Sequence, residues 1–238
     1  MPNLTISNTD GYTFVNPLSS SSSLSDARNA TTANGINNTL SLLYCIHSGI
    51  FNRYYVFRPI LFFDFSGNDD DGTSLSGQTV TAASLQITTS PNVTGFINWT
   101  AETDKKVMVC KTNGAGTTVD SGDFNALDNW PSSGSYEGTV TKYGEANQNA
   151  NAVIIISLSA QAVTDINAAI SGGSIFSMAM CVEDDWTYSG DLCSGTSALE
   201  GIRIYSGNST GSKPKLMLTY GAAPAAPTDN ATFFGTNF

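Results

Sequence analysis

Most of this 238-residue sequence consists of short apolar stretches separated by clusters of glycine, serine, threonine, asparagine and aspartate. The stretch ILFFDF at 60–65 is apolar on both faces of an extended chain, which predicts a central strand covered on both sides. Pro59 precedes it and cannot donate a ladder hydrogen bond, so we expect Pro59 to begin the strand or to lie at a sheet edge. Many such stretches with turn residues between them are typical of an all-β domain.

Further stretches have the alternation of a strand with one buried face. In 81–89 the apolar residues share one side, and 175–183 alternates in the same way. The stretch AVIIISL at 152–158 predicts a buried strand. The apolar sets of the two alternating strands are Ala83, Leu85 and Ile87, and Phe176, Met178, Met180 and Val182. The other expected strands lie at 95–101, 105–111, 201–206 and 213–220.

Only the segment 159–173 has apolar residues that repeat convincingly at the spacing of an α-helix. Ser159 is a suitable N-cap, and Gly172 and Gly173 can end the helix in the left-handed conformation. The apolar stripe consists of Val163, Ile166 and Ile170.

A shorter helical turn is expected at 121–130, with Asp123 as its N-cap, and a polar loop at 184–199. Many strands with one or two short helices predict an all-β fold, a β-sandwich of jelly-roll type. We expect one sandwich domain at 41–220, preceded by a polar strand and loop segment at 1–40 that could serve as an anchor.

The last segment, 221–238, predicts an arm rich in proline and alanine with an aromatic tip. We expect the prolines to stiffen the arm and the tip to insert into a neighbouring protein, since burying a phenylalanine contributes roughly 1.5–3 kcal/mol. The residues of this partner-binding tip are Phe233, Phe234 and Phe238.

The charge balance restricts the possible partners. The formal net charge is −10, only 13% of residues are charged, and no basic stripe is present, so nucleic-acid binding is not expected. The sequence contains no apolar run long enough for a transmembrane helix and no signal peptide at its start, so we expect no membrane partner and synthesis in a host cytoplasm.

Cys181 and Cys193 could form a disulfide, but buried free thiols are the favoured interpretation.

The stretches RPILFFDFS and TVTAASLQI, followed by the helix and strand of 159–183 and by a closing PKLMLTY, resemble the DNRLRE-type β-sandwich domain found in bacteriophage and environmental-virus structural proteins. The resemblance covers about Arg58 to Tyr220. It implies a non-catalytic domain that serves as a carbohydrate-binding or adhesive module in bacterial enzymes, or as a tail, fibre or capsid-surface part in viruses.

No catalytic motif is present in the sequence. His47 is the only histidine, and no GxSxG supports a triad that includes it. Glycoside hydrolysis needs two facing carboxyl groups, and nothing in the sequence pairs the acidic residues. We therefore expect no enzyme. The carboxylates available for such a pair are Glu102, Asp104, Glu137, Glu145, Glu183 and Glu200.

Two acidic runs and one aromatic loop are candidate binding sites. The runs could hold calcium, because hard oxygen ligands in a loop suit that ion, although solvated acidic loops explain them as well. Trp186 and Tyr188, in one loop, could stack on a sugar, although ordinary packing is the alternative for them and for Trp99, Trp130 and Tyr136. The acidic runs are Asp69, Asp70 and Asp71, and Glu183, Asp184 and Asp185. No other cofactor is expected.

Two functions therefore stand as expectations. The first is a non-catalytic bacteriophage virion protein, a capsid decoration, head-fibre or tail surface component, attached to other virion proteins and to copies of itself through its terminal arm. The second is a carbohydrate-binding or adhesive module that binds a polysaccharide. The two can coexist, because a virion surface protein can also hold a host surface glycan.

Overall fold

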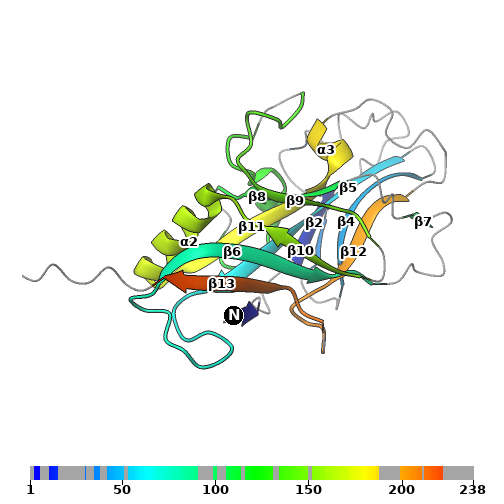
Figure 1. Ribbon diagram of the computed structural model, residues 1–238. Helices are drawn as coiled ribbons and strands as arrows, with labels where there is room; N and C mark the ends of the chain where they lie inside the picture. The colour runs from blue at the N-terminus through cyan, green and yellow to red at the C-terminus, as the bar shows by residue number, and fades with distance from the viewer. Residues whose placement is uncertain are drawn as a thin grey trace, which may run out of the picture.

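Two antiparallel sheets pack face to face in the computed structural model, as Figure 1 shows, and confirm the expected all-β sandwich. The jelly-roll topology stays a prediction. The backbone is described for residues 3–5, 11–15, 30, 35–37, 42–50, 53–90, 99–100, 106–113, 116–130, 134–149, 152–187, 199–210 and 212–221. Side chains are described for residues 30, 56–90, 106–113, 116–130, 134–149, 152–183, 185–187, 202–210 and 212–221.

The small sheet has the strand order β1-β13-β6-β10, and the large sheet runs β7-β12-β4-β5-β11-β8-β9, with β2 pairing β5 and β3 pairing β2. The strands of the small sheet are β1 (Asn3–Thr5), β6 (Thr79–Thr88), β10 (Val153–Ser157) and β13 (Lys215–Gly221). Those of the large sheet are β2 (Gly11–Val15), β3 (Gly35–Asn37), β4 (Leu42–Ile50), β5 (Arg53–Asp64), β7 (Trp99–Thr100), β8 (Lys106–Lys111), β9 (Lys142–Asn147), β11 (Ile175–Val182) and β12 (Leu199–Tyr205).

The polar segment 1–40 contributes strands to both sheets. β1 pairs with the last strand, β13, and β2 pairs with β5 in the middle of the large sheet. Strands from both ends of the described chain therefore lie side by side in the sandwich.

The long strand β5 occupies the centre of the large sheet, as its two apolar faces predicted. Leu61 and Phe63 face the small sheet, whereas Ile60 and Phe62 face a second hydrophobic core on the opposite side. The expected start of this strand at Pro59 is wrong, because β5 already begins at Arg53. Pro59 lies opposite Tyr12 in the ladder to β2, and the ladder to β11 begins at the next residue, Ile60.

The second core explains why β5, β8 and β11 are buried on both faces. The connection from β8 to β9, described at 113, 116–130 and 134–141 and called the 113–141 segment below, places these described parts over the outer side of the large sheet together with the short helix α3 (Glu183–Thr187). Cys110 on β8 and Cys181 on β11 belong to this core, whereas their sequence neighbours Val109 and Met180 belong to the main core. Such alternation places successive side chains of one strand in two separate cores.

The edge strand β10 differs from the expected fully buried strand. It pairs only with β6 in the described part of the chain, and its side chains alternate between buried and exposed. Val153 and Ile155 are each 58% exposed, whereas Ile154 and Ile156 point into the main core. An unbroken apolar run does not reveal from sequence whether its strand is covered on one face or on both.

The helix α2 (Ala160–Gly172) confirms the predicted helix and its caps. The Ser159 side chain accepts a hydrogen bond from the Ala162 backbone N–H, and Gly173 ends the helix with φ 55°. The helix packs on β6, where the Asn167 side chain bonds both the N–H and the C=O of Val80. Within the described residues, no helix is both long and apolar enough to span a bilayer.

Two local predictions need correction. The short helix η1 (Ser121–Asn125) is capped by Asp120, and Asp123 is the third helical residue, whose side chain accepts from the Asp120 N–H in a reciprocal capping box. The expected loop at 184–199 is helical at its start, because α3 continues directly from β11. This helix brings Asp185 and Trp186 under the 113–141 segment.

Candidate functional site

A charged group, the guanidinium of Arg58, lies in the second core, where the residue is only 1% exposed. Its Nε and one terminal nitrogen donate to the two carboxylate oxygens of Asp185, each at 2.8 Å. The other terminal nitrogen donates to the Phe124 carbonyl at 2.9 Å, and the Tyr136 hydroxyl is a further partner. One side chain thereby connects β5 to α3 and to two positions of the 113–141 segment, Phe124 and Tyr136.

Aromatic rings enclose this ion pair. The central guanidinium carbon lies 4.1 Å from the ring centroid of Phe124 and 4.2 Å from that of Trp130. Tyr136 packs at 4.9 Å from Trp130 and edge-on against Trp186, whose centroid is 6.0 Å away. Stacked rings exclude water from the pair and add cation–π attraction, which strengthens when the cation is desolvated.

The charge state of Arg58 follows from these surroundings. Burial alone would lower the pKa of the guanidinium, but the adjacent Asp185 carboxylate more than offsets this, and the pKa is raised above its ordinary value. Both partners are therefore held in their charged forms. With its hydrogen-bonding groups engaged inside the protein, the cluster acts as a structural lock, which we call the Arg58 lock (Arg58, Phe124, Trp130, Tyr136 and Asp185).

Trp186 does not provide the predicted surface for sugar stacking. Its side chain is 1% exposed, and its indole N–H donates to the Glu137 carboxylate at the surface of the protein. The Lys142 ammonium lies 5.6 Å from its ring centroid. The packing alternative is therefore correct for Trp186, whereas Tyr188 lies outside the described residues.

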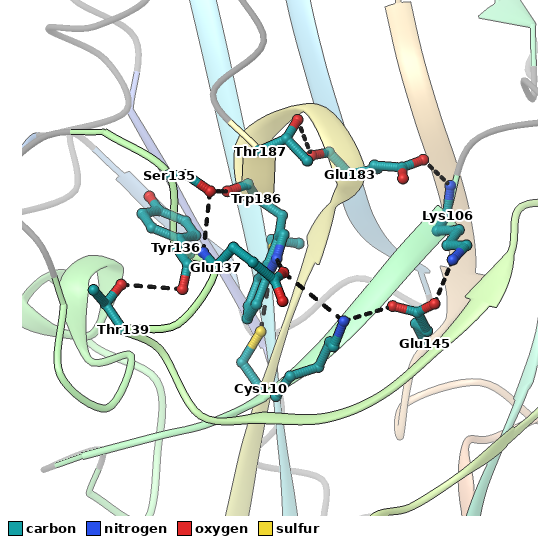
Figure 2. Close-up of polar contacts among 12 residues, drawn as sticks. Lys106, Cys110, Ser135, Tyr136, Glu137, Thr139, Glu145, Glu183, Trp186 and Thr187 are labelled. Carbon is teal, nitrogen blue, oxygen red and sulfur yellow. Dashed lines mark hydrogen bonds and ion pairs between the residues drawn. The ribbon is translucent and has the colours of Figure 1, made fainter.

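A row of alternating charges lies beside Trp186, and Figure 2 labels four of its members, Lys106, Glu137, Glu145 and Glu183. The Lys106 ammonium donates to Glu145, whose other oxygen accepts from Lys142 at 2.8 Å. Lys142 also lies 3.9 Å from Glu137, and the Lys106 backbone N–H donates to Glu183 at 3.0 Å. Three of the six carboxylates considered as candidates for hydrolysis therefore lie in this row: Glu137, Glu145 and Glu183.

Glu145 does not have the protonation behaviour that the general acid of a glycosidase needs. Such an enzyme needs one carboxylic acid whose pKa is raised so that it can protonate the leaving group. Hydrogen bonds from Lys106 and Lys142 instead lower the pKa of Glu145. Glu145 therefore stays ionised and cannot act as a general acid.

In the described structure, neither of the two acidic runs gathers its carboxylates at one point. Asp185 is bound to Arg58 and Glu183 to β8, while the side chain of Asp184 lies outside the described residues. The first run forms a turn in which Asp69 accepts from the backbone N–H groups of Asp71 and Thr73. Among the described residues, no three histidine, cysteine, aspartate or glutamate side chains lie together as a metal site would require.

The side chains of the remaining predicted site residues lie outside the described residues. His47 lies on β4 opposite Glu200 of β12, but both side chains lie outside the described set. The partner-binding tip, Phe233, Phe234 and Phe238, also lies outside the described residues. These predictions remain untested.

Two buried thiols meet beneath the Arg58 lock. The sulfurs of Cys110 and Cys181 are 3.9 Å apart, both residues are free, and both are fully buried. The free-thiol interpretation of Cys181 is therefore confirmed. Burial, followed by the contact with Cys110, raises the pKa of Cys181 well above its ordinary value.

We predict that Cys110 and Cys181 of the native protein resist alkylation. Iodoacetamide reacts with the thiolate, and both burial and the raised pKa of Cys181 suppress that form. Peptide mapping by mass spectrometry, with and without denaturant, would measure each cysteine separately. Modification of these two residues in native protein at the rate of an exposed thiol would contradict the buried arrangement.

The described fold defines the class of this chain as an all-β sandwich protein with a second core under the connection from β8 to β9. No family model matches the chain, and no curated protein sequence matches it. The resemblance to the DNRLRE-type domain stays a prediction.

Sequence reasoning did not identify the Arg58 lock as a unit. It recognised Trp130, Tyr136 and Trp186 only as aromatic residues that could stack on a sugar. One sequence signal was available: Arg58 stands close to the apolar stretch 60–65 in a chain with few charged residues. An arginine that is buried with such a strand requires a carboxylate partner. Its partner Asp185 stands 127 positions away, and no local pattern connects the two.

Proposed function

We propose that this protein is a non-catalytic structural component of a bacteriophage virion, exposed on the particle surface and attached to other virion proteins or to copies of itself. The observation that carries the proposal is the outer face of the small sheet. Val153 and Ile155, the exposed large hydrophobic residues of the described chain, both lie there on the edge strand β10.

The rest of that face is almost without charge. The neighbouring outward side chains of β6 are small or amides, and on β13 the only charged one in the described part is Lys215. In a chain of net charge −10, such a face can meet another protein without like-charge repulsion. The outward residues beside Val153 and Ile155 are Ser84, Gln86, Thr88, Lys215, Met217 and Thr219.

The internal chemistry of the described part is consistent with a structural role. Glu145, one of the carboxylates that could have served in hydrolysis, pairs with Lys106 and Lys142, and Trp186, one of the sugar-stacking candidates, is buried. The aromatic arm predicted from sequence, with Phe233, Phe234 and Phe238, would supply a second attachment. Calcium binding and a role in carbohydrate adhesion through Trp186 receive no support from the geometry.

Quantitative mass spectrometry of purified virus particles tests this function. We expect the chain in a fixed copy number relative to the major capsid protein, equal to it or a simple fraction of it. A ratio near one would indicate capsid decoration, and a small ratio a fibre or tail part. Absence of the chain from purified particles would overturn the proposal.

The attachment surface can be tested in the same particles. We expect the double variant Val153→Lys and Ile155→Lys to fold normally, because both side chains are exposed, and to be depleted from particles. Ser171→Lys, at an exposed position of α2, is the matched control and should be incorporated normally. Normal incorporation of the double variant would show that this face does not carry the attachment.

A further inference from the structure

The edge strand β10 pairs with β6 on one side, and no strand of the described part pairs with it on the other. Just beyond its two ends, the Ala152 carbonyl accepts from the Thr89 N–H at 2.9 Å, and the Leu158 N–H donates to the Ala83 carbonyl at 3.0 Å. Backbone groups alternate in direction along an antiparallel strand. The even-numbered residues of 152–158 therefore direct their backbone groups toward β6, and the odd-numbered ones direct theirs away from it.

This alternation leaves an open edge at Val153 and Ile155. Within the described residues, nothing pairs with the N–H or the C=O of either one. The next outward groups along the strand are covered by β9, because Gly144 lies against the Ser157 carbonyl oxygen and the Ser159 N–H donates to β9 at 2.7 Å. The open edge is thus short, with two donors and two acceptors.

The open edge lacks the features that normally keep an exposed strand from pairing, which are charged side chains, proline and bulges. The strand reads VIIIS, and its ladder to β6 runs without a register shift. The sequence contains no ionisable side chain between Glu145 and Asp165. An uncharged, β-branched edge with unpaired backbone groups can accept a further strand.

We propose that β10 pairs antiparallel with β10 of a second copy of this chain, so that the two small sheets form one continuous sheet. In the two-fold register that places Ile154 opposite its counterpart, Val153 of each copy lies opposite Ile155 of the other. Each of these two pairs exchanges two hydrogen bonds, which engage every backbone group of both open edges. The exposed side chains of the same residues meet across the pair on the outer face, where neighbouring β-branched side chains stabilise a sheet.

A second copy fits this edge better than an unrelated strand. Because β9 limits the open stretch to 153–155, a longer strand would meet β9 at Ser157 or keep backbone groups of its own unpaired, whereas a second copy brings a stretch of equal length. The chain has a net charge of −10, and the uncharged segment 146–164 lets two copies approach without opposing like charges at this strand. The contact is isologous, so it closes at two copies.

The inference rests on the proposed function in that it uses the same exposed residues, and it names a second copy as their partner. Four backbone bonds and four side chains make a small contact, and small contacts are weak. We expect half of the chains to pair in solution at roughly 0.1–1 mM. Copies held side by side on a particle would pair more completely, because their effective concentration is higher.

Amide hydrogen exchange of the purified full chain, followed by NMR beside analytical ultracentrifugation, tests the pairing at about 20 µM and about 1 mM. We expect the amides of Val153 and Ile155 to exchange freely in the monomer and about twofold more slowly when half of the chains are paired, because only unpaired chains expose them. The amides of Ile154 and Ile156 face β6 and should be protected at both concentrations.

Three results of this measurement would overturn the proposal. The chain could stay monomeric up to about 1 mM. It could dimerise while the amides of Val153 and Ile155 stay unprotected, which would place the contact elsewhere. Both amides could also be protected already in the monomer, which would mean that another part of the same chain covers the edge.

A proline substitution separates strand pairing from simple contact between side chains. Ile155→Pro removes an N–H that points away from β6, so the ladder to β6 keeps its bonds, while the dimer loses one donor from each copy. We expect Ile155→Pro to stay monomeric at concentrations where the native chain is half paired. Ile155→Val keeps the N–H and a β-branched side chain, so this matched control should pair as the native chain does.

Val153→Pro, at the first residue of the strand, is the second variant if Ile155→Pro does not fold. Native-like pairing in a folded proline variant would overturn the proposal. Pairing in solution and presence in particles can fail separately. A native chain that stays monomeric while Val153→Lys with Ile155→Lys is depleted from particles would overturn the pairing alone, and a chain that pairs at β10 but is absent from particles would overturn only the virion role.

Discussion

Replacing Asp185 by asparagine is expected to lower the free energy of unfolding by about 3–5 kcal/mol, the usual cost of leaving one member of a buried ion pair without its partner. The Arg58 guanidinium would keep its charge, because the ordinary pKa of an arginine side chain lies far above neutral pH, but would lose its two bonds to an ionised acceptor. Urea unfolding followed by tryptophan fluorescence would measure the change, since Trp130 and Trp186 both lie at the site.

A double-mutant cycle separates the ion pair from simple loss of packing. Arg58→Met alone should destabilise the protein by a similar amount, whereas Arg58→Met combined with Asp185→Leu should cost much less than the sum of the two single changes. Lys142→Met is a matched control, because Lys142 approaches the ring of Trp186 from the partly exposed side and should contribute less than about 1 kcal/mol. Additive effects of the Arg58 and Asp185 changes would contradict the lock.

Gly144→Ala is expected to destabilise the protein by about 1–3 kcal/mol or more, because β9 passes directly over β10 at this glycine. A Cβ there would lie 2.6 Å from the Ser157 carbonyl oxygen and 2.8 Å from a methyl group of Ile156. The first contact is with backbone, which cannot move away as a flexible side chain can. Thermal or urea unfolding of the purified variant would measure the effect.

Gly67→Ala is the matched control for this prediction. Gly67 lies in an exposed loop, an added Cβ meets nothing within 4 Å, and its φ is not in the left-handed region. The control should be neutral or slightly stabilising, because alanine reduces the freedom of the unfolded chain. Equal stabilities of the two variants would mean that β9 and β10 do not approach as closely as described.

The regular elements were well predicted where the signal is local. The alternation in β6 and β11 and the helical stripe of α2 correctly identified which side chains enter the main core. The caps of α2 were also predicted correctly, because Ser159 and Gly173 act on groups of the same helix end. The cap of η1 was misplaced because Asp120 and Asp123 have the same side chain and both take part in the capping box.

The candidate sites were poorly predicted because burial decides their chemistry. In sequence, Asp185 and Trp186 read as an acidic run beside an aromatic loop, which suggested calcium or sugar. In the structure, α3 turns both inward, so the same side chains hold Arg58 and fill the second core. The polar contacts of Asp165 were also missed, because they join residues of α2, β8 and β9.

The sequence by itself determined the class of the fold, the central place of β5 and the existence and ends of α2. These follow from periodicity and capping, which operate between residues a few positions apart. Only the tertiary structure decided which face of β10 stays exposed, that the large sheet has a core on each side, and that Arg58 meets Asp185 from 127 positions away. Those outcomes depend on which strands become neighbours, and the pairing of distant strands is not encoded in any local pattern.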